Sequence, residues 1–128
     1  MKTVWVNGCF DVLHIGHIEL LKYAKSLGDK LVVGIDVDSR VKEMKGQERP
    51  INTTIDRMNM LKSIKYVDDV TFFGTDDELR RSIELHGANI MVVGSDYKNK
   101  KVIGSDLVDD VLYFNRIGDY STTNIINK

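Results

Sequence analysis

Two histidines stand three residues apart in the segment GCFDVLHIGH, residues 8–17. The segment follows an apolar run, TVWV, and precedes a stretch with helical spacing, so we expect it to form the turn between a strand and a helix. His17 then falls at the start of the helix, where unpaired amides and the helix dipole favour an anion. Gly8 permits a tight turn and Gly16 permits close approach of a ligand to the backbone. Because the imidazoles of His14 and His17 can donate to phosphate oxygens, the segment predicts a phosphate-binding turn, although it is neither G-x-G-x-x-G nor a P-loop.

Two other interpretations of the histidine pair stay open at this point. The histidines could cap the helix, or they could form half of a metal site. A zinc site needs a third protein ligand, for which only His86 and carboxylates remain. Cys9 is the single cysteine, so the sequence offers no internal disulfide and no Cys/His cluster with zinc spacing.

The strand–turn–helix frame is part of a pattern that alternates along the chain. Five short runs rich in β-branched, aliphatic or aromatic residues predict strands: TVWVN, KLVVGID, DDVTFF, NIMVV and DVLYFN. Three stretches with helical spacing lie among them: HIELLKYAKSLG, TTIDRMNMLKSI (with Thr53 or Thr54 as its N-cap) and DDELRRSIELHG. We expect the helices to face the core with Leu20, Leu21, Ala24, Leu27, Ile55, Met58, Leu61, Ile64, Leu79 and Ile83.

This alternation predicts βαβ units and a parallel sheet covered on both faces. The fold class expected is α/β, a single Rossmann-like doubly wound domain over residues 1–128 with a mainly parallel sheet. In such sheets ligands bind outside the carboxyl ends of the strands, where the strand order reverses, and segment 8–17 would begin that site. The charged stretch KGQERPI, around Pro50, is expected to be a mobile loop between helices.

Composition narrows the function classes. A chain of 128 residues with 42% hydrophobic and 29% charged residues is typical of one globular domain. The formal net charge of −1 gives no reason to expect binding to nucleic acid or to an anionic membrane. The sequence shows no signal peptide and no membrane-spanning run, so we expect a cytoplasmic protein.

Four motifs in order resemble the cytidylyltransferase-like nucleotidyltransferases. GCFDVLHIGH is similar to the signature G-x-F-D-x-x-H-x-G-H of that family, KGQERP with DRMNML resembles its middle segment, and GSDY and STTNII resemble two later nucleotide-contacting stretches. The resemblance implies that a phosphate oxygen of an acceptor attacks the α-phosphorus of a nucleoside triphosphate and that pyrophosphate leaves. Catalysis of this step consists of alignment and of stabilising negative charge.

The resemblance also implies roles for individual residues. His14 and His17 would stabilise charge on the triphosphate, Lys45 would reach the phosphates or the acceptor, and Arg57 would lie near the acceptor or the phosphates. A solvated lysine and a surface salt bridge are the structural alternatives for Lys45 and Arg57. The nucleotide-binding residues implied are Gly8, Cys9, Phe10, Asp11, Gly16, Gly94, Asp96, Arg116, Ser121, Thr122 and Thr123.

Some of these assignments carry their own alternatives. Asp11 either orients the histidine loop through backbone amides or helps to place Mg²⁺. A helix N-cap is the structural alternative for Ser121 and Thr122. No dedicated protein metal site is expected, because Mg²⁺ would arrive with the triphosphate.

The substrates divide the family resemblance into two branches. KGQERP and GSDYKNKKVIGS resemble the adenylyltransferase of ADP-heptose synthase, which implies a phosphorylated sugar such as heptose 1-phosphate as the acceptor. Arg116 and the short chain resemble glycerol-3-phosphate cytidylyltransferase, which makes CDP-glycerol. The heptose branch matches over more residues, whereas the choice between ATP and CTP stays open. A homodimer is implied by the family, and a nucleotide-binding module without turnover is the alternative from another class.

Overall fold

A five-stranded sheet forms the centre of the protein in the computed structural model, which describes residues 1–95 and 100–115. All strand pairs are parallel and the order is β3-β2-β1-β4-β5. The strands are β1 (Thr3–Gly8), β2 (Lys30–Asp36), β3 (Asp69–Phe73), β4 (Ile90–Gly94) and β5 (Asp110–Phe114). All five predicted strands are therefore confirmed, and so is the doubly wound α/β fold.

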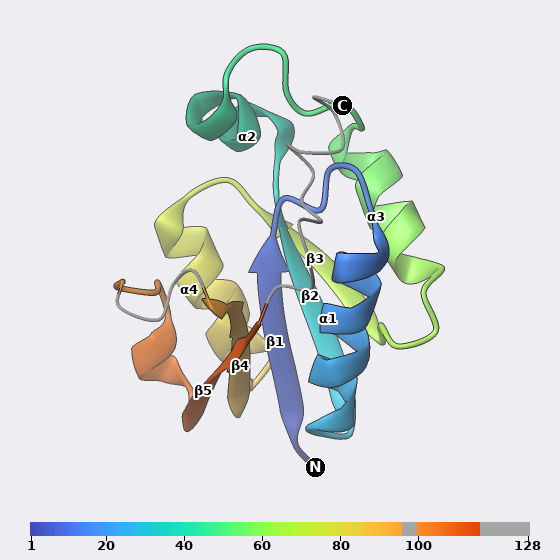
Figure 1. Ribbon diagram of the computed structural model, residues 1–128. Coiled ribbons are helices and arrows are strands. Elements are labelled where there is room, and N and C mark those ends of the chain that lie inside the picture. Colours follow the sequence, from blue (N-terminus) through green and yellow to red (C-terminus); the bar gives the residue numbers. More distant parts are fainter. Residues whose placement is uncertain (96–99, 116–128) are drawn as a thin grey trace.

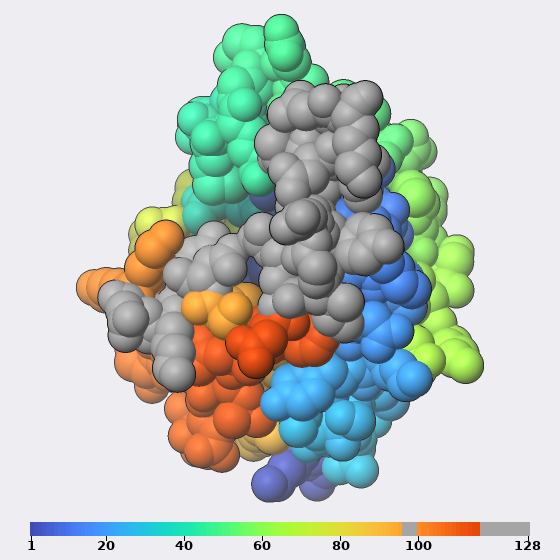
Figure 2. Space-filling model, in the orientation of Figure 1, coloured from blue at the N-terminus to red at the C-terminus, as the bar shows by residue number. Residues whose placement is uncertain are grey.

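Helices cover both faces of this sheet. They are α1 (Ile15–Ser26), α2 (Asp38–Lys45), α3 (Thr54–Lys62) and α4 (Asp76–Leu85), with a short 3₁₀ helix, η2 (Ser105–Leu107). Helices α1 and α3 lie on one face and α4 lies on the other (Figure 1). Helix α2 stands at the carboxyl edge of the sheet, where Figure 2 shows it and the residues after it as a projection from the surface.

The core divides in two because neighbouring residues of a strand point to opposite faces. Val4 and Val6 of β1 pack with Leu21 and Ala24 of α1. Trp5, between the two valines, packs on the other face in the cluster that contains Leu79 and Ile83 of α4. Burial of these apolar side chains on both faces is the main contribution that holds the helices against the sheet.

The predicted helix faces are correct with one exception. Leu61 of α3 is buried, and Met58 of α3 and Ile64, just beyond the end of the helix, pack against the core as the spacing predicts. The prediction that Ile55 faces the core is wrong, because its side chain is 70% exposed. The buried residue in this turn of α3 is Arg57, which is fully inaccessible to solvent. Helix α2 was not among the predicted helices, and Val41 is its one buried residue.

The order of the strands fixes where a ligand site can form. Strand β1 lies between β2 and β4, so the chain runs outward from β1 in both directions. The turn after β1 therefore lies at the point where the strand order reverses, which is the usual ligand position in such sheets. Within the part of the chain that the structure describes, no helix is long and apolar enough to cross a bilayer.

Candidate active site

The histidine pair closes the first turn of α1. His14 is the N-cap residue and its Nδ1 accepts from the backbone N–H of Gly16 at 3.1 Å. His17 returns the interaction, because its Nδ1 accepts from the N–H of His14 at 3.3 Å. The two rings are stacked, with centroids 3.9 Å apart and planes 25° apart. The capping interpretation is thus confirmed, and it gives both imidazoles a fixed orientation.

The capping bonds also indicate which ring nitrogen carries the proton when each imidazole is neutral. A neutral imidazole whose Nδ1 accepts a hydrogen bond carries its proton on Nε2. Burial and, to a lesser extent, the neighbouring His14 together lower the pKa of His17 from 6.5 to about 4. His17 is therefore neutral at pH 7 and offers an Nε2–H donor rather than a positive charge.

Phe10 packs against the histidine pair from the side of the core. Its backbone has a φ of +48°, an uncommon conformation for a side chain of this size. The ring is buried in the core and contacts the His17 ring at a centroid distance of 5.2 Å. Gly8 leaves room for it, because a Cβ at Gly8 would lie 3.3 Å from the Phe10 ring. The family resemblance predicts that both residues bind the nucleotide, and the structure gives them a packing role beside the histidines.

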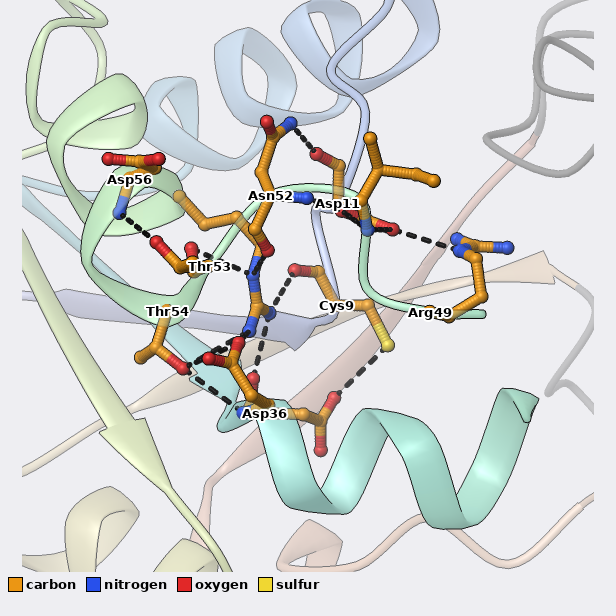
Figure 3. A network of polar contacts seen from close by, with 11 residues as sticks. Cys9, Asp11, Asp36, Arg49, Asn52, Thr53, Thr54 and Asp56 are labelled. Atoms are coloured by element: carbon orange, nitrogen blue, oxygen red, sulfur yellow. Dashed lines mark hydrogen bonds and ion pairs between the residues drawn. The ribbon is translucent and has the colours of Figure 1, made fainter. Parts of the chain in front are cut away.

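Asp11 ties the histidine turn to the loop that precedes α3. Its side chain is inaccessible to solvent and accepts from the backbone N–H groups of Ile51 and Asn52 and from Nε of Arg49 at 2.9 Å. The Asn52 side chain donates in turn to the backbone oxygen of Asp11 (Figure 3). The amides that Asp11 engages therefore belong to residues 51 and 52 rather than to the histidine loop.

This anchoring corrects the expectation that the whole KGQERPI loop is mobile. Residues 46–48 are exposed, but Asp11 holds the part from Arg49 to Asn52. Burial alone would raise the pKa of Asp11, but hydrogen bonds from Asn52 and Ile51 and the contact with Arg49 outweigh it and lower the pKa. Asp11 is thus an ionised carboxylate whose two oxygens are both engaged within the chain, so it offers no oxygen to Mg²⁺ in this arrangement.

Arg57 forms a second hydrogen-bond network, which joins the ends of β1 and β2. Its Nη1 donates to the backbone oxygens of Cys9 at 2.9 Å and Asp36 at 2.8 Å. Nη2 donates to Asp38 and Thr54, and Nε donates to the backbone oxygens of residues 52 and 53. Every N–H of the guanidinium has an acceptor inside the protein. The surface salt bridge considered from the sequence is wrong, and no donor of Arg57 is left for an acceptor phosphate in this structure.

Cys9 lies beside the Arg57 network, and Lys45 is near enough for its positive charge to act on the thiol. Cys9 Sγ donates to Asp36 at 3.5 Å, and burial together with the charge of Asp36 raises the pKa of the thiol to about 11. Cys9 therefore stays a thiol at neutral pH and is unsuited to nucleophilic attack. Lys45 is the exposed last residue of α2, on the projection above the sheet edge.

The remaining predicted site residues fall into two groups. Gly94 ends β4, the strand beside β1, so it shares the carboxyl edge with Gly8. A Cβ at Gly94 would meet no atom within 4 Å, so the space above it is open. Within residues 1–95 and 100–115, no group of three or more histidine, cysteine or acidic side chains could hold a metal ion. Asp96, Arg116, Ser121, Thr122 and Thr123 lie outside the described residues.

Sequence reasoning missed two residues of this network. Arg49 and Asn52 were not singled out, although Arg49 is part of the KGQERP motif that carries the resemblance. Nothing in the sequence around Arg49 shows that it binds the buried carboxylate of Asp11, which lies 38 positions earlier. The signal that was available is the motif itself, which places an arginine directly before the proline.

Comparisons with known proteins identify the family of the chain. The model of the cytidylyltransferase-like family matches residues 5–128. The chain is 48% identical over 125 residues to the bifunctional protein HldE of Campylobacter fetus subsp. fetus, and 44% identical over 127 residues to that of Helicobacter hepaticus. These matches cover 98% and 99% of the chain, which spans 27% and 26% of the length of these relatives.

Solved structures show the same fold. A lipopolysaccharide core biosynthesis protein from Thermoplasma volcanium is 28% identical with a TM-score of 0.69, over 94% of this chain and 99% of its own. Pantothenate synthetase from Thermus thermophilus has a TM-score of 0.70 at 15% identity, over 98% of this chain and 61% of its own, and shares the fold. Because the family model matches nearly the whole length, we conclude that the chain belongs to the cytidylyltransferase-like family.

Proposed function

We propose that the protein transfers a nucleoside monophosphate from ATP or CTP to a phosphorylated sugar resembling heptose 1-phosphate. A phosphate oxygen of the sugar attacks the α-phosphorus, and the bond from the α-phosphorus to the pyrophosphate oxygen breaks. The sugar-phosphate acceptor is supported by the similarity to HldE proteins and to a protein of lipopolysaccharide core biosynthesis. The KGQERP and GSDYKNKKVIGS motifs support the same branch.

The observation that carries the proposal is the stacked histidine pair at the start of α1. Their capping bonds hold both rings before any substrate arrives, so reorientation during the reaction costs little. The low pKa of His17 keeps it neutral, which suits a donor to phosphate oxygens that gain charge in the transition state. Lys45 would add a positive charge from the projection above the sheet edge.

Mg²⁺ enters this proposal as part of the substrate. Triphosphates are used as their Mg²⁺ complexes, and the ion keeps most of its ligands from phosphate and water. The residues present fit that mode, because Asp11, the carboxylate three residues before His14 in the sequence, has both oxygens engaged by loop donors. The protein would therefore bind the ion mainly through the triphosphate. A homodimer is part of the proposal, and light scattering of the purified protein measures it.

A screen of four triphosphates against heptose 1-phosphate, glucose 1-phosphate and glycerol 3-phosphate tests the function through released pyrophosphate. We expect release with ATP or CTP and a sugar phosphate. Arg80→Gln is the matched control, because Arg80 lies on α4 in an exposed ion pair with Asp106. This variant should release pyrophosphate at the wild-type rate.

The other outcomes of the screen each point to a different function. A preference for glycerol 3-phosphate would contradict the sugar acceptor and identify the glycerol branch. Binding of a triphosphate by calorimetry without release for any acceptor would contradict catalysis and identify a nucleotide-binding module.

A further inference from the structure

The two arginines of the polar network differ in how their donors are used. Every N–H of Arg57 is taken by the chain itself. Arg49 donates from Nε to Asp11 at 2.9 Å, and its side chain is 11% exposed. Its Nη2 is buried, and no described residue accepts a hydrogen bond from it. Figure 3 shows Arg49 beside the carboxylate of Asp11.

A buried guanidinium donor without an acceptor is unfavourable, because the group loses its water and gains nothing in return. Arg49 cannot escape this by turning away, since Nε is bound to a carboxylate that is itself fixed by two backbone amides. The same contact keeps Arg49 beside the histidine turn, because Asp11 stands three residues before His14. The network therefore keeps a charged donor in place near the edge where the ligand binds.

Phosphate oxygens match this donor best. A guanidinium presents its N–H groups in a planar fork and forms short, charge-assisted bonds to phosphate. Asp11 uses one edge of Arg49 and leaves Nη2 for an oxygen that arrives with a ligand.

We propose that Arg49 binds a phosphate group of a substrate through Nη2, and that Asp11 positions it for this contact. This inference rests on the proposed function and deepens it, because the arginine near the phosphates becomes Arg49 instead of Arg57. The phosphate belongs either to the triphosphate donor or to the sugar acceptor. Both present the same chemistry, so the experiment has one arm for each source.

Calorimetry with Arg49→Gln and Arg49→Lys measures the contact directly. One arm titrates ATP, CTP and inorganic tripolyphosphate, and the other titrates heptose 1-phosphate. We expect at least tenfold weaker binding in one arm for Arg49→Gln, which removes the charge. Arg49→Lys keeps a charge beside Asp11 but has a single nitrogen in place of the planar fork, so it should recover only part of the affinity. Arg80→Gln should bind as the wild type does.

Thermal melts accompany each titration, and Arg49→Lys carries the test if Arg49→Gln does not fold. Unchanged affinity of both Arg49 variants in both arms, with a wild type that binds, would overturn the inference and leave the proposed function intact. A wild-type protein that binds no triphosphate and no sugar phosphate would contradict the proposed function and this inference with it. Weaker binding in the triphosphate arm assigns Arg49 to the donor, and weaker binding in the other arm assigns it to the acceptor.

Discussion

Replacing Arg57 by alanine should destabilise the protein strongly. The change leaves the backbone oxygens of Cys9 and Asp36 without their arginine donor at the ends of two central strands. Each buried acceptor that loses its partner costs about 1–3 kcal/mol, so we expect a loss of about 2–6 kcal/mol in the free energy of unfolding. The ion pair to Asp38 adds little, since that side chain is 41% exposed. At about 3–5 °C per kcal/mol for a chain of this length, a loss of this size lowers the melting temperature by roughly 6–30 °C.

Urea unfolding followed by circular dichroism measures this loss, with two comparison variants. Arg57→Lys keeps the charge but cannot reach acceptors on several sides at once, so it should recover little of the stability. Arg80→Ala, at an exposed pair, should leave the urea midpoint unchanged. An Arg57→Ala protein that unfolds at the wild-type midpoint and loses only affinity for the acceptor would refute the structural role. It would restore the contact with a substrate phosphate that the sequence predicts.

Three further predictions concern the edge of the sheet. His14→Ala and His17→Ala should each lower kcat about a hundred- to thousandfold, the usual effect of losing a preorganised donor, and near-normal turnover would remove that residue from the mechanism. The folded protein holds the pKa of His17 at about 4 against 6.5, so the unfolded chain takes up a proton that the folded one does not. The free energy of unfolding should therefore fall as the pH drops from 6.5 to 4, and an equal slope in His17→Gln would contradict this. Lys45→Ala should keep the wild-type melting temperature while kcat falls, and an unchanged kcat at saturating substrates would make Lys45 a solvated surface residue.

Local patterns predicted most of the fold. The strands are short apolar runs, and β1, β2 and β4 have several consecutive buried residues because both faces of the sheet are covered there. The histidine turn could also be predicted, since two imidazoles and a glycine at a strand–helix junction are visible in the sequence alone. Helix α2 could not be predicted in this way, because it has a single buried residue and lies at the sheet edge, where apolar periodicity is weak.

The site network depends on contacts between distant residues, which spacing does not show. Ile55 and Arg57 are two positions apart on α3, and hydrophobicity alone places the isoleucine inside. Arg57 is buried because β1 and β2 end there and present carbonyl oxygens that need donors. Asp11 and Arg49 meet for a similar reason, since the loop before α3 folds back over the turn after β1. In both cases the partner lies more than 20 residues away.

The central claim is that nucleotidyl transfer occurs at the α-phosphorus. Incubating the protein and the sugar phosphate with triphosphate labelled at the α- or the γ-phosphorus tests it directly. The account predicts that the α label appears in a sugar nucleotide and that the γ label appears in pyrophosphate, in equal amounts. A γ label found on the sugar, or an α label that stays in free nucleotide while pyrophosphate is released, would contradict it.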